Sequence, residues 1–275
     1  MTEDRNGSRA ELSRRRLLRT SAAAGTAATA GCLGGGTDGE DTVYGFNTGD
    51  MTVSLTDPAD DAVVTTTHLG ATSSFPSNQY TPRLADDGEE VLWLNVGEGV
   101  RAATVGSLET VAEVETGSGA NWLERTPDGE HLVVSAREPA HRNLRIDADP
   151  DSERFGEVTG EIDRTDEPAV GDRDGVGPCD VSIDPEGEYA FVPDLYGDTL
   201  TVLSVDSFEI VTQVEVDAVG DAEHARPWMG TAGWHGEVLM IENDEGERGT
   251  ESIWDVSDPG APEEVVRLTT EDGLG

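Results

Sequence analysis

A short turn followed by an apolar run recurs four times along this chain, and no other feature limits its fold so strongly. The copies span residues 87–94, 127–134, 185–192 and 234–241. Each turn holds a glycine, and successive glycines are separated by 41, 58 and 49 residues. Pairs such as Asp-Gly adopt the positive φ angles of a tight turn, and the apolar run that follows is typical of a buried strand. We therefore expect one β-hairpin in each repeat.

A second strand pair follows the first hairpin in at least two repeats. Residues 103–114 and 203–214 alternate apolar and polar side chains around a Ser-containing turn, which is the pattern of half-buried strands. No stretch shows convincing helical periodicity. Four strands repeated about every 40 to 50 residues is the period of a β-propeller blade. The sequence predicts an all-β fold with four-stranded antiparallel blades near residues 79–116, 120–160, 178–217 and 226–269.

The two ends of the repeat region predict an incomplete ring. Residues 43–67 offer only the last two strands of a blade, at 51–55 and 62–67. Residues 272–275 repeat the Asp-Gly-X-Gly pattern of residues 174–177, which stands just before an inner strand. We expect about four and a half blades in an open arc, truncated at the carboxyl terminus. The alternative is a closed ring of about five irregular blades.

These segments resemble the YVTN-type β-propeller repeats, whose signature is a strand pair around Pro-Asp-Gly followed by V-x-D-x-x-[ST]-x-x-V-x-x-[IV]. Residues 252–259, Ser-Ile-Trp-Asp-Val-Ser-Asp-Pro, are similar to the related LVIVD repeat. The resemblance covers most of residues 43–271 and implies the fold. It does not imply an activity, because such propellers serve as enzymes, binding modules and scaffolds alike.

The charge of the chain indicates adaptation to molar salt. It carries 57 acidic and 18 basic residues, a formal net charge of −39, and all the basic residues are arginine. At 1 M salt the Debye length falls to roughly 3 Å, so crowded carboxylates are screened and hold hydration instead of repelling one another. The alternative interpretation of the acidic composition is that the carboxylates bind cations. Nucleic acid is excluded as an expected partner, because it requires clustered basic residues.

The amino terminus has the pattern of an export signal with a lipid attachment site. Residues 13–19 match the twin-arginine motif around Arg14 and Arg15, and the apolar run at 20–31 is shorter than the roughly 20 apolar residues that span a bilayer. The sequence before Cys32 resembles a lipobox. The alternative, a disordered Arg-rich tail, does not explain that run.

The expected organisation is a signal peptide at 1–31, a lipidated Cys32 with a flexible Gly-rich linker at 32–42, and a propeller domain at 43–275. Membrane lipid would bind through Cys32, at the outer face of the cytoplasmic membrane. With the acidic composition, this arrangement resembles lipoproteins of haloarchaeal type. Cys179 is then the second of only two cysteines. It is expected to be buried and structural, because its neighbours offer no base for a nucleophile.

The candidate ligand-binding residues lie where the chain enters the predicted inner strands over the central channel, and they are Tyr80, Trp122, His224, Arg226 and Trp228. An imidazole and a guanidinium beside Trp228 suit a carboxylate or a sugar. The alternative is an arginine paired with one of the many acids and a tryptophan that fills space between blades. The five histidines have no consistent blade position, so no metal site is predicted.

No cofactor is predicted, and calcium is the alternative. The Asp-rich stretches 147–151 and 172–175 suit a hard cation but do not match the EF-hand pattern. Phosphate-binding loops and the Gly-x-Ser-x-Gly elbow are absent, so catalytic residues stay unassigned. The sequence favours a cell-surface module that binds or scaffolds an unknown protein or glycan. The alternative is a propeller enzyme, such as a lactonase-like hydrolase or an oxidoreductase subunit, with its site over the channel.

Overall fold

The computed structural model describes residues 43–76, 91–233, 235–245 and 249–269 of the 275-residue chain. The described residues form strands, turns and loops, and the confirmed fold class is all-β. None of them belongs to a helix with the length and hydropathy needed to cross a membrane.

The strands form five antiparallel sheets in chain order. The first sheet contains β1 (Val43–Asn47), β2 (Thr52–Asp57) and β3 (Ala62–His68). The second contains β4 (Ala71–Pro76), β5 (Val91–Val96), β6 (Gly99–Thr104) and β7 (Thr110–Glu115). The third contains β8 (Asn121–Arg125), β9 (His131–Ala136), β10 (Arg142–Asp147) and β11 (Val158–Asp163).

The two remaining sheets follow the same order of strands. The fourth contains β12 (Ser182–Ile183), β13 (Tyr189–Asp194), β14 (Thr199–Ser204) and β15 (Glu209–Glu215). The fifth contains β16 (Pro227–Ala232), β17 (Val238–Asp244), β18 (Gly249–Asp255) and β19 (Glu263–Leu268).

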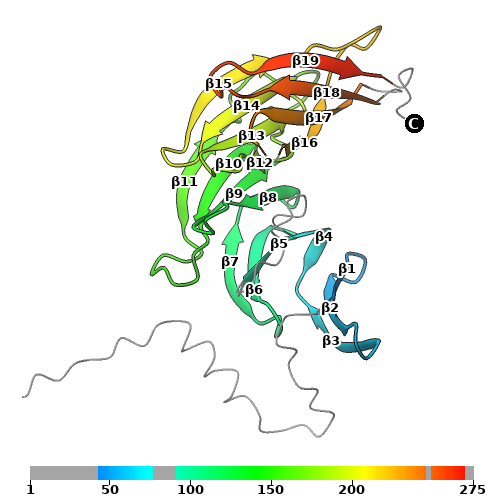
Figure 1. Ribbon diagram of the computed structural model, residues 1–275, viewed down its shortest axis with the longest axis vertical. Coiled ribbons are helices and arrows are strands. Elements are labelled where there is room, and N and C mark those ends of the chain that lie inside the picture. Colours follow the sequence, from blue (N-terminus) through cyan, green and yellow to red (C-terminus); the bar gives the residue numbers. More distant parts are fainter. Residues whose placement is uncertain (1–42, 77–90, 234, 246–248, 270–275) are drawn as a thin grey trace, which may run out of the picture.

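Each sheet is a propeller blade, and the blades succeed one another along an open arc (Figure 1). The inner strand β12 contacts the inner strands β8 and β16 of the neighbouring sheets. Among the described strands β1 pairs with β2 alone and β19 with β18 alone, so no strand pair joins the ends into a ring. The expectation of an incomplete ring of about four and a half blades is confirmed.

Two boundaries differ from those expected. The first sheet has three strands instead of two, because Val43–Asn47 also pairs along β2. Its Tyr44 and Phe46 pack on the cluster around Leu55, and this packing outweighs the weak strand signal of a short segment with a central glycine. The inner strand of the second sheet is β4 at 71–76, earlier than the expected start near residue 79.

The repeated turns are the hairpins that the sequence predicted. Gly129, Gly187 and Gly236 connect the first two strands of the last three sheets with φ of 79°, 78° and 70°. The Asp128 carboxylate accepts hydrogen bonds from the Thr126 hydroxyl (2.5 Å) and the Glu130 N–H (3.0 Å). Asp128 therefore stabilises its turn. The first copy, at residues 87–88, lies outside the described residues.

The core lies between the sheets. We call the face of a sheet that points to the next sheet along the chain its forward face, and the opposite face its rear face. Trp93, Val133 and Phe191 each occupy the third position of the second strand on a forward face, and each is at most 1% exposed. Rear-face residues such as Leu132 belong to the cluster shared with the preceding sheet. Each sheet is thus stabilised chiefly by its neighbours.

Candidate functional site

Two kinds of segment meet at one end of the blades. The entry segments run from an outer strand to the next inner strand, at 116–120, 164–181 and 216–226, and the middle loops join the second and third strands, at 137–141 and 195–198. Because neighbouring strands are antiparallel, both kinds leave the sheets at the same end. The predicted ligand-binding residues at 122, 224, 226 and 228 lie in or directly after entry segments.

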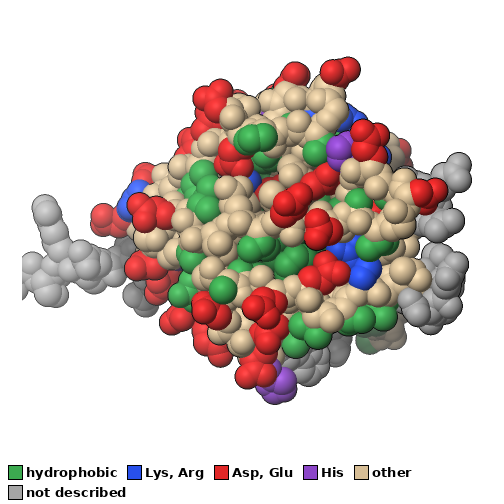
Figure 2. All heavy atoms as spheres, turned by 90° about the horizontal axis from the view of Figure 1, so that it is seen from above, with side chains coloured by type: hydrophobic (Ala, Val, Ile, Leu, Met, Phe, Trp, Pro, Cys, Tyr) green, Lys and Arg blue, Asp and Glu red, His purple; other side chains and the backbone are tan. Residues whose placement is uncertain are grey.

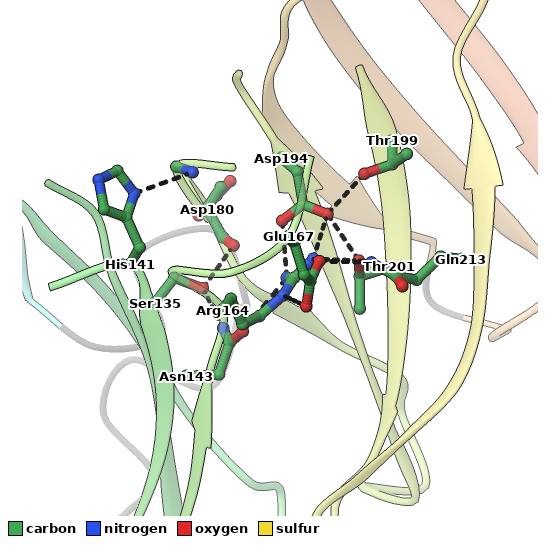
Figure 3. Close-up of polar contacts among 11 residues, drawn as sticks. Ser135, His141, Asn143, Arg164, Glu167, Asp180, Asp194, Thr199, Thr201 and Gln213 are labelled. Atoms are coloured by element: carbon green, nitrogen blue, oxygen red, sulfur yellow. Dashed lines mark hydrogen bonds and ion pairs between the residues drawn. The ribbon is translucent and has the colours of Figure 1, made fainter. Parts of the chain in front are cut away.

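A buried ion pair fixes the longest entry segment to the fourth sheet (Figure 3). Arg164 follows β11, and its guanidinium binds Asp194 at the end of β13 through Nη1–Oδ1 (2.8 Å) and Nη2–Oδ2 (2.9 Å). Both side chains are 0% exposed. Glu167 accepts two further bonds, from Nε (2.8 Å) and Nη2 (2.7 Å). The guanidinium is saturated, so Arg164 is a structural residue.

A cluster of arginines on aromatic rings lies at the same end of the blades. The Arg137 guanidinium in a middle loop lies 5.3 Å from the ring centroid of Trp228 in β16. Arg173 in the long entry segment lies 4.2 Å from the ring centroid of Tyr196. The Tyr196 hydroxyl donates to Glu138 Oε1 (3.3 Å). We call these residues, 137, 138, 173, 196 and 228, the arginine–aromatic cluster.

The cluster presents positive charge on an otherwise acidic molecule. Arg137 Nε lies 2.7 Å from Glu138 Oε2, an ion pair without the alignment of a hydrogen bond. The side chain of Arg137 is 18% exposed and that of Glu138 is 41% exposed. The cluster contains two guanidiniums and one carboxylate, and Arg137 is the one paired with that carboxylate. A guanidinium stacked on a ring keeps its N–H edge available for an anion, so the arrangement suits a carboxylate ligand.

Glycines allow the long entry segment to pass close to the cluster. Gly177 has φ of +63°, and a Cβ on it would lie 2.5 Å from Cδ2 of Tyr196. A Cβ on Gly175 would lie 2.6 Å from Cγ of His141. His141 Nδ1 accepts the Gly177 N–H (3.2 Å), and burial lowers the pKa of this imidazole, which favours the neutral acceptor form. Residues 175–177 are therefore held between His141 and Tyr196.

Cys179 lies beneath the cluster and is 0% exposed. Burial raises the pKa of its thiol to about 12, although the Arg137 Nη1 is 3.7 Å from the sulfur. A thiol with this pKa holds almost no thiolate at neutral pH and is a poor nucleophile. The expected structural role is confirmed, and the cysteine is free.

The structure separates the predicted ligand-binding residues into different environments. His224 Nδ1 lies 2.9 Å from Asp198 Oδ2, and the Arg226 backbone N–H donates to Oδ1 of the same carboxylate (2.8 Å). Trp228 instead packs beneath Arg137. Trp122 is half-buried in β8. His224 and Asp198 thus support the entry to the fifth sheet, and Arg137 is the cation beside Trp228.

The sequence pattern did not indicate Arg137, Arg173 or Tyr196 as site residues. Arg137 and Tyr196 each follow the second strand of a blade, in Ala136-Arg137-Glu138-Pro139 and Asp194-Leu195-Tyr196-Gly197. An arginine or tyrosine at the start of a middle loop is therefore the sequence signal that could have indicated them. Tyr80, Cys32, Arg14 and Arg15 lie outside the described residues.

The first of the two acidic stretches considered for calcium forms hydrogen bonds within its own loop. Asp147 accepts the Asp149 N–H (3.2 Å) and the Ser152 hydroxyl (2.7 Å), and Asp149 accepts the Asp151 N–H (2.9 Å). Asp172 and Asp174 are exposed. Across the part of the chain that the structure describes, no three His, Cys, Asp or Glu side chains gather in a way that could hold a metal ion.

Comparison with known proteins supports the fold alone. No protein-family model and no curated protein sequence matches the chain. Among solved structures, Kluyveromyces lactis Hsv2 is similar with a TM-score of 0.56 and 12% identity, covering 79% of this chain and 59% of that one. A structure of the mitotic checkpoint complex is similar with a TM-score of 0.57 and 13% identity, covering 80% of this chain and 59% of that one.

Kuenenia stuttgartiensis hydrazine synthase is also similar, with a TM-score of 0.54 and 12% identity, covering 83% of this chain and 63% of that one. All three matches are to β-propellers, and the chain spans less than two thirds of each. Identities this low show a shared architecture and no shared activity.

Proposed function

We propose that this chain is a binding module whose recognition site is the arginine–aromatic cluster, and that it works on the outside of the cell in high salt. The repeats are proposed to be of the YVTN and LVIVD type, and Cys32 to carry the lipid that holds the module at the membrane. The one observation that carries the binding proposal is the stacking of Arg137 on Trp228 beside that of Arg173 on Tyr196.

The ligand class follows from the chemistry of the cluster. Guanidinium N–H groups bind carboxylates in a fork, and aromatic rings bind the apolar faces of sugars. An acidic glycan offers both groups. The net charge of −39 repels such a ligand in dilute buffer, but molar salt screens the repulsion and leaves contact interactions. The function is therefore expected only in high salt.

The test is binding to immobilised oligosaccharides in roughly 2 M KCl, where screening is nearly complete. Uronic-acid oligosaccharides are compared with their neutral counterparts. We expect the acidic series to be retained, and Arg137→Gln or Trp228→Leu to reduce binding at least about tenfold. The matched control is Arg154→Gln, which removes an exposed arginine in the β10–β11 loop at the opposite end of the blade.

Equal retention of the neutral and acidic series, or equal loss in Arg154→Gln and Arg137→Gln, would overturn the proposal. Thermal unfolding of each variant separates lost binding from lost folding, because Arg137 and Trp228 also contribute to packing.

A further inference from the structure

The two arginines of the arginine–aromatic cluster differ in the contacts that they already make. Arg137 Nε lies 2.7 Å from Glu138 Oε2, and Arg137 Nη1 lies 3.7 Å from the sulfur of Cys179. Two of the three nitrogens of this guanidinium therefore have a partner within the protein. The guanidinium also lies over the ring of Trp228. These contacts fix Arg137 in place and leave little of its N–H edge for a ligand.

Arg173 is free where Arg137 is held. Its guanidinium lies 4.2 Å from the ring centroid of Tyr196, and with the residues that the structure describes it forms no hydrogen bond or ion pair. Asp172 and Asp174, its neighbours in sequence, are exposed and do not pair with it. Arg173 thus presents a guanidinium that is positioned by an aromatic ring and whose fork of N–H groups is open to a ligand.

The open fork contrasts with the acidic surface of the molecule. The face drawn in Figure 2 carries many acidic side chains and few basic ones. Arg154, an exposed arginine elsewhere on the surface, pairs with Glu157 at 3.2 Å. The stacking on Tyr196 holds the Arg173 guanidinium away from such acceptors. It therefore remains available to an anion from outside the chain.

Glu138 sets the charge of the site. Its Oε2 is buried against Arg137, and its Oε1 accepts the hydroxyl of Tyr196 (3.3 Å). Burial and the Glu138 carboxylate raise the pKa of Tyr196, so the phenol stays protonated and remains the donor. Glu138 is therefore fixed by two residues of the cluster, at the edge of the ring on which Arg173 lies.

The arrangement leaves one positive charge for a ligand. Arg137 and Glu138 compensate each other, and Arg173 supplies the charge that is left. A single phenol, which is about as large as one sugar ring, bridges the Arg173 guanidinium and the Glu138 carboxylate. A carboxylate bound at Arg173 is attracted, whereas additional negative charge at the same place is repelled by Glu138.

We infer that Arg173 binds the carboxylate of the ligand and that Glu138 restricts the site to one negative charge per sugar. The Arg173 fork would donate to both carboxylate oxygens of a uronic acid residue. Glu138 would disfavour a phosphorylated sugar, because a phosphate monoester carries about 1.5 to 2 negative charges at pH 7. These roles rest on the proposed function, since both belong to the same recognition site.

The role of Arg173 is tested with a galacturonic-acid trisaccharide and its methyl ester, which keeps the rings and hydroxyls but has no charge. Isothermal titration calorimetry in roughly 2 M KCl measures both affinities. We expect the wild type to bind the acid at least about tenfold more tightly than the ester, and Arg173→Gln to bind both equally. The ester should bind both proteins alike. The matched control, Arg154→Gln, should keep the preference for the acid.

The role of Glu138 is tested with galactose 6-phosphate, which carries its phosphate on the carbon that bears the carboxylate in galacturonic acid. This sugar competes with the labelled trisaccharide. Competition should be weak in the wild type and at least about tenfold stronger in Glu138→Gln, which keeps the shape of the side chain and removes its charge. The control is Glu157→Gln, which also removes the charge of a glutamate paired with an arginine and should leave the competition unchanged.

The outcomes separate the two proposals. Equal binding of acid and ester by the wild type would overturn the proposed function and, with it, these roles. A wild-type preference for the acid that Arg173→Gln retains, or phosphate competition that Glu138→Gln leaves unchanged, would overturn the roles alone. Arg173→Lys keeps the charge without the fork and should restore part of the preference for the acid. Thermal unfolding of each variant shows that the fold is kept, as expected for an exposed Arg173.

Discussion

Arg164 and Asp194 form a two-pronged ion pair in which neither side chain touches solvent, and this pair joins the long entry segment to the second strand of the fourth sheet. The Thr199 and Thr201 hydroxyls donate to the same Asp194 oxygen at 2.8 Å and 2.6 Å, so the carboxylate is saturated as well. The segment it fixes carries Arg173 and the backbone beneath Tyr196. The buried pair therefore supports the proposed recognition site without reaching it.

Removing one partner of this pair should be strongly destabilising. Arg164→Met leaves Asp194 buried and uncompensated, and we expect a loss of about 3 to 5 kcal/mol in the free energy of unfolding. The double variant Arg164→Met, Asp194→Leu should recover part of that loss, because no isolated charge is left. Denaturant unfolding is measured for the wild type, Arg164→Met, Asp194→Leu and the double variant, and a double variant as unstable as the sum of the two single variants would contradict this account.

Stability should fall as pH rises through the neutral range because of Asp180. This carboxyl is 2% exposed, accepts the Gly230 N–H (2.9 Å) from β16, and has its pKa raised by burial to about 7. The folded state therefore binds the proton more tightly than the unfolded chain. The stabilisation that this bound proton provides is complete below about pH 3.8, the pKa of the carboxyl in the unfolded chain. It is lost as the pH rises to about 7, the pKa in the folded state.

Asp180→Asn mimics the protonated acid and should remove this slope. Between pH 4 and 8 we expect the wild type to lose roughly 3 to 4 kcal/mol relative to the variant. The control is Asp163→Asn, since hydrogen bonds from Thr165 lower the pKa of that exposed carboxyl and its effect lies at lower pH. Parallel pH profiles for wild type and Asp180→Asn would show that Asp180 is ionised throughout.

Gly177→Ala should destabilise the chain more than Gly171→Ala. Both glycines have φ near +65°, so both substitutions carry the same backbone strain. Only at position 177 does the new Cβ meet a side chain, the ring of Tyr196 at 2.5 Å, whereas nothing lies within 4 Å at position 171. Overpacking should add about 1 to 3 kcal/mol to the difference. Equal thermal midpoints for the two variants would refute the close approach.

Thermal stability should increase with salt over the molar range. A net charge of −39 on this chain produces strong self-repulsion in dilute buffer, and salt screens it. We expect a higher unfolding midpoint in about 3 M than in roughly 0.1 M KCl. An unchanged midpoint would argue against adaptation to high salt.

Export and anchoring should depend on three residues of the amino terminus. Lysine in place of Arg14 and Arg15 is expected to hold the protein in the cytoplasm, and Cys32→Ser to prevent lipid attachment. Fractionation and metabolic labelling with a radioactive lipid precursor measure the two steps. A Cys32→Ser protein that still carries label would rule out this cysteine as the anchor.

The repeated turn glycines and the alternating runs determined the blades by themselves, because positive φ angles and strand periodicity are local properties of sequence. The sequence also predicted that Cys179 is buried, because its neighbours offer no base for a nucleophile. Tertiary structure alone decided that Arg137 lies over Trp228, 91 positions away along the chain. It also decided that His224 binds Asp198 and does not join Trp228 in one site. Sheet packing also decided that Met240 is exposed while Phe191 is buried. Both are hydrophobic residues at the same strand position, and only the presence or absence of a covering sheet distinguishes them.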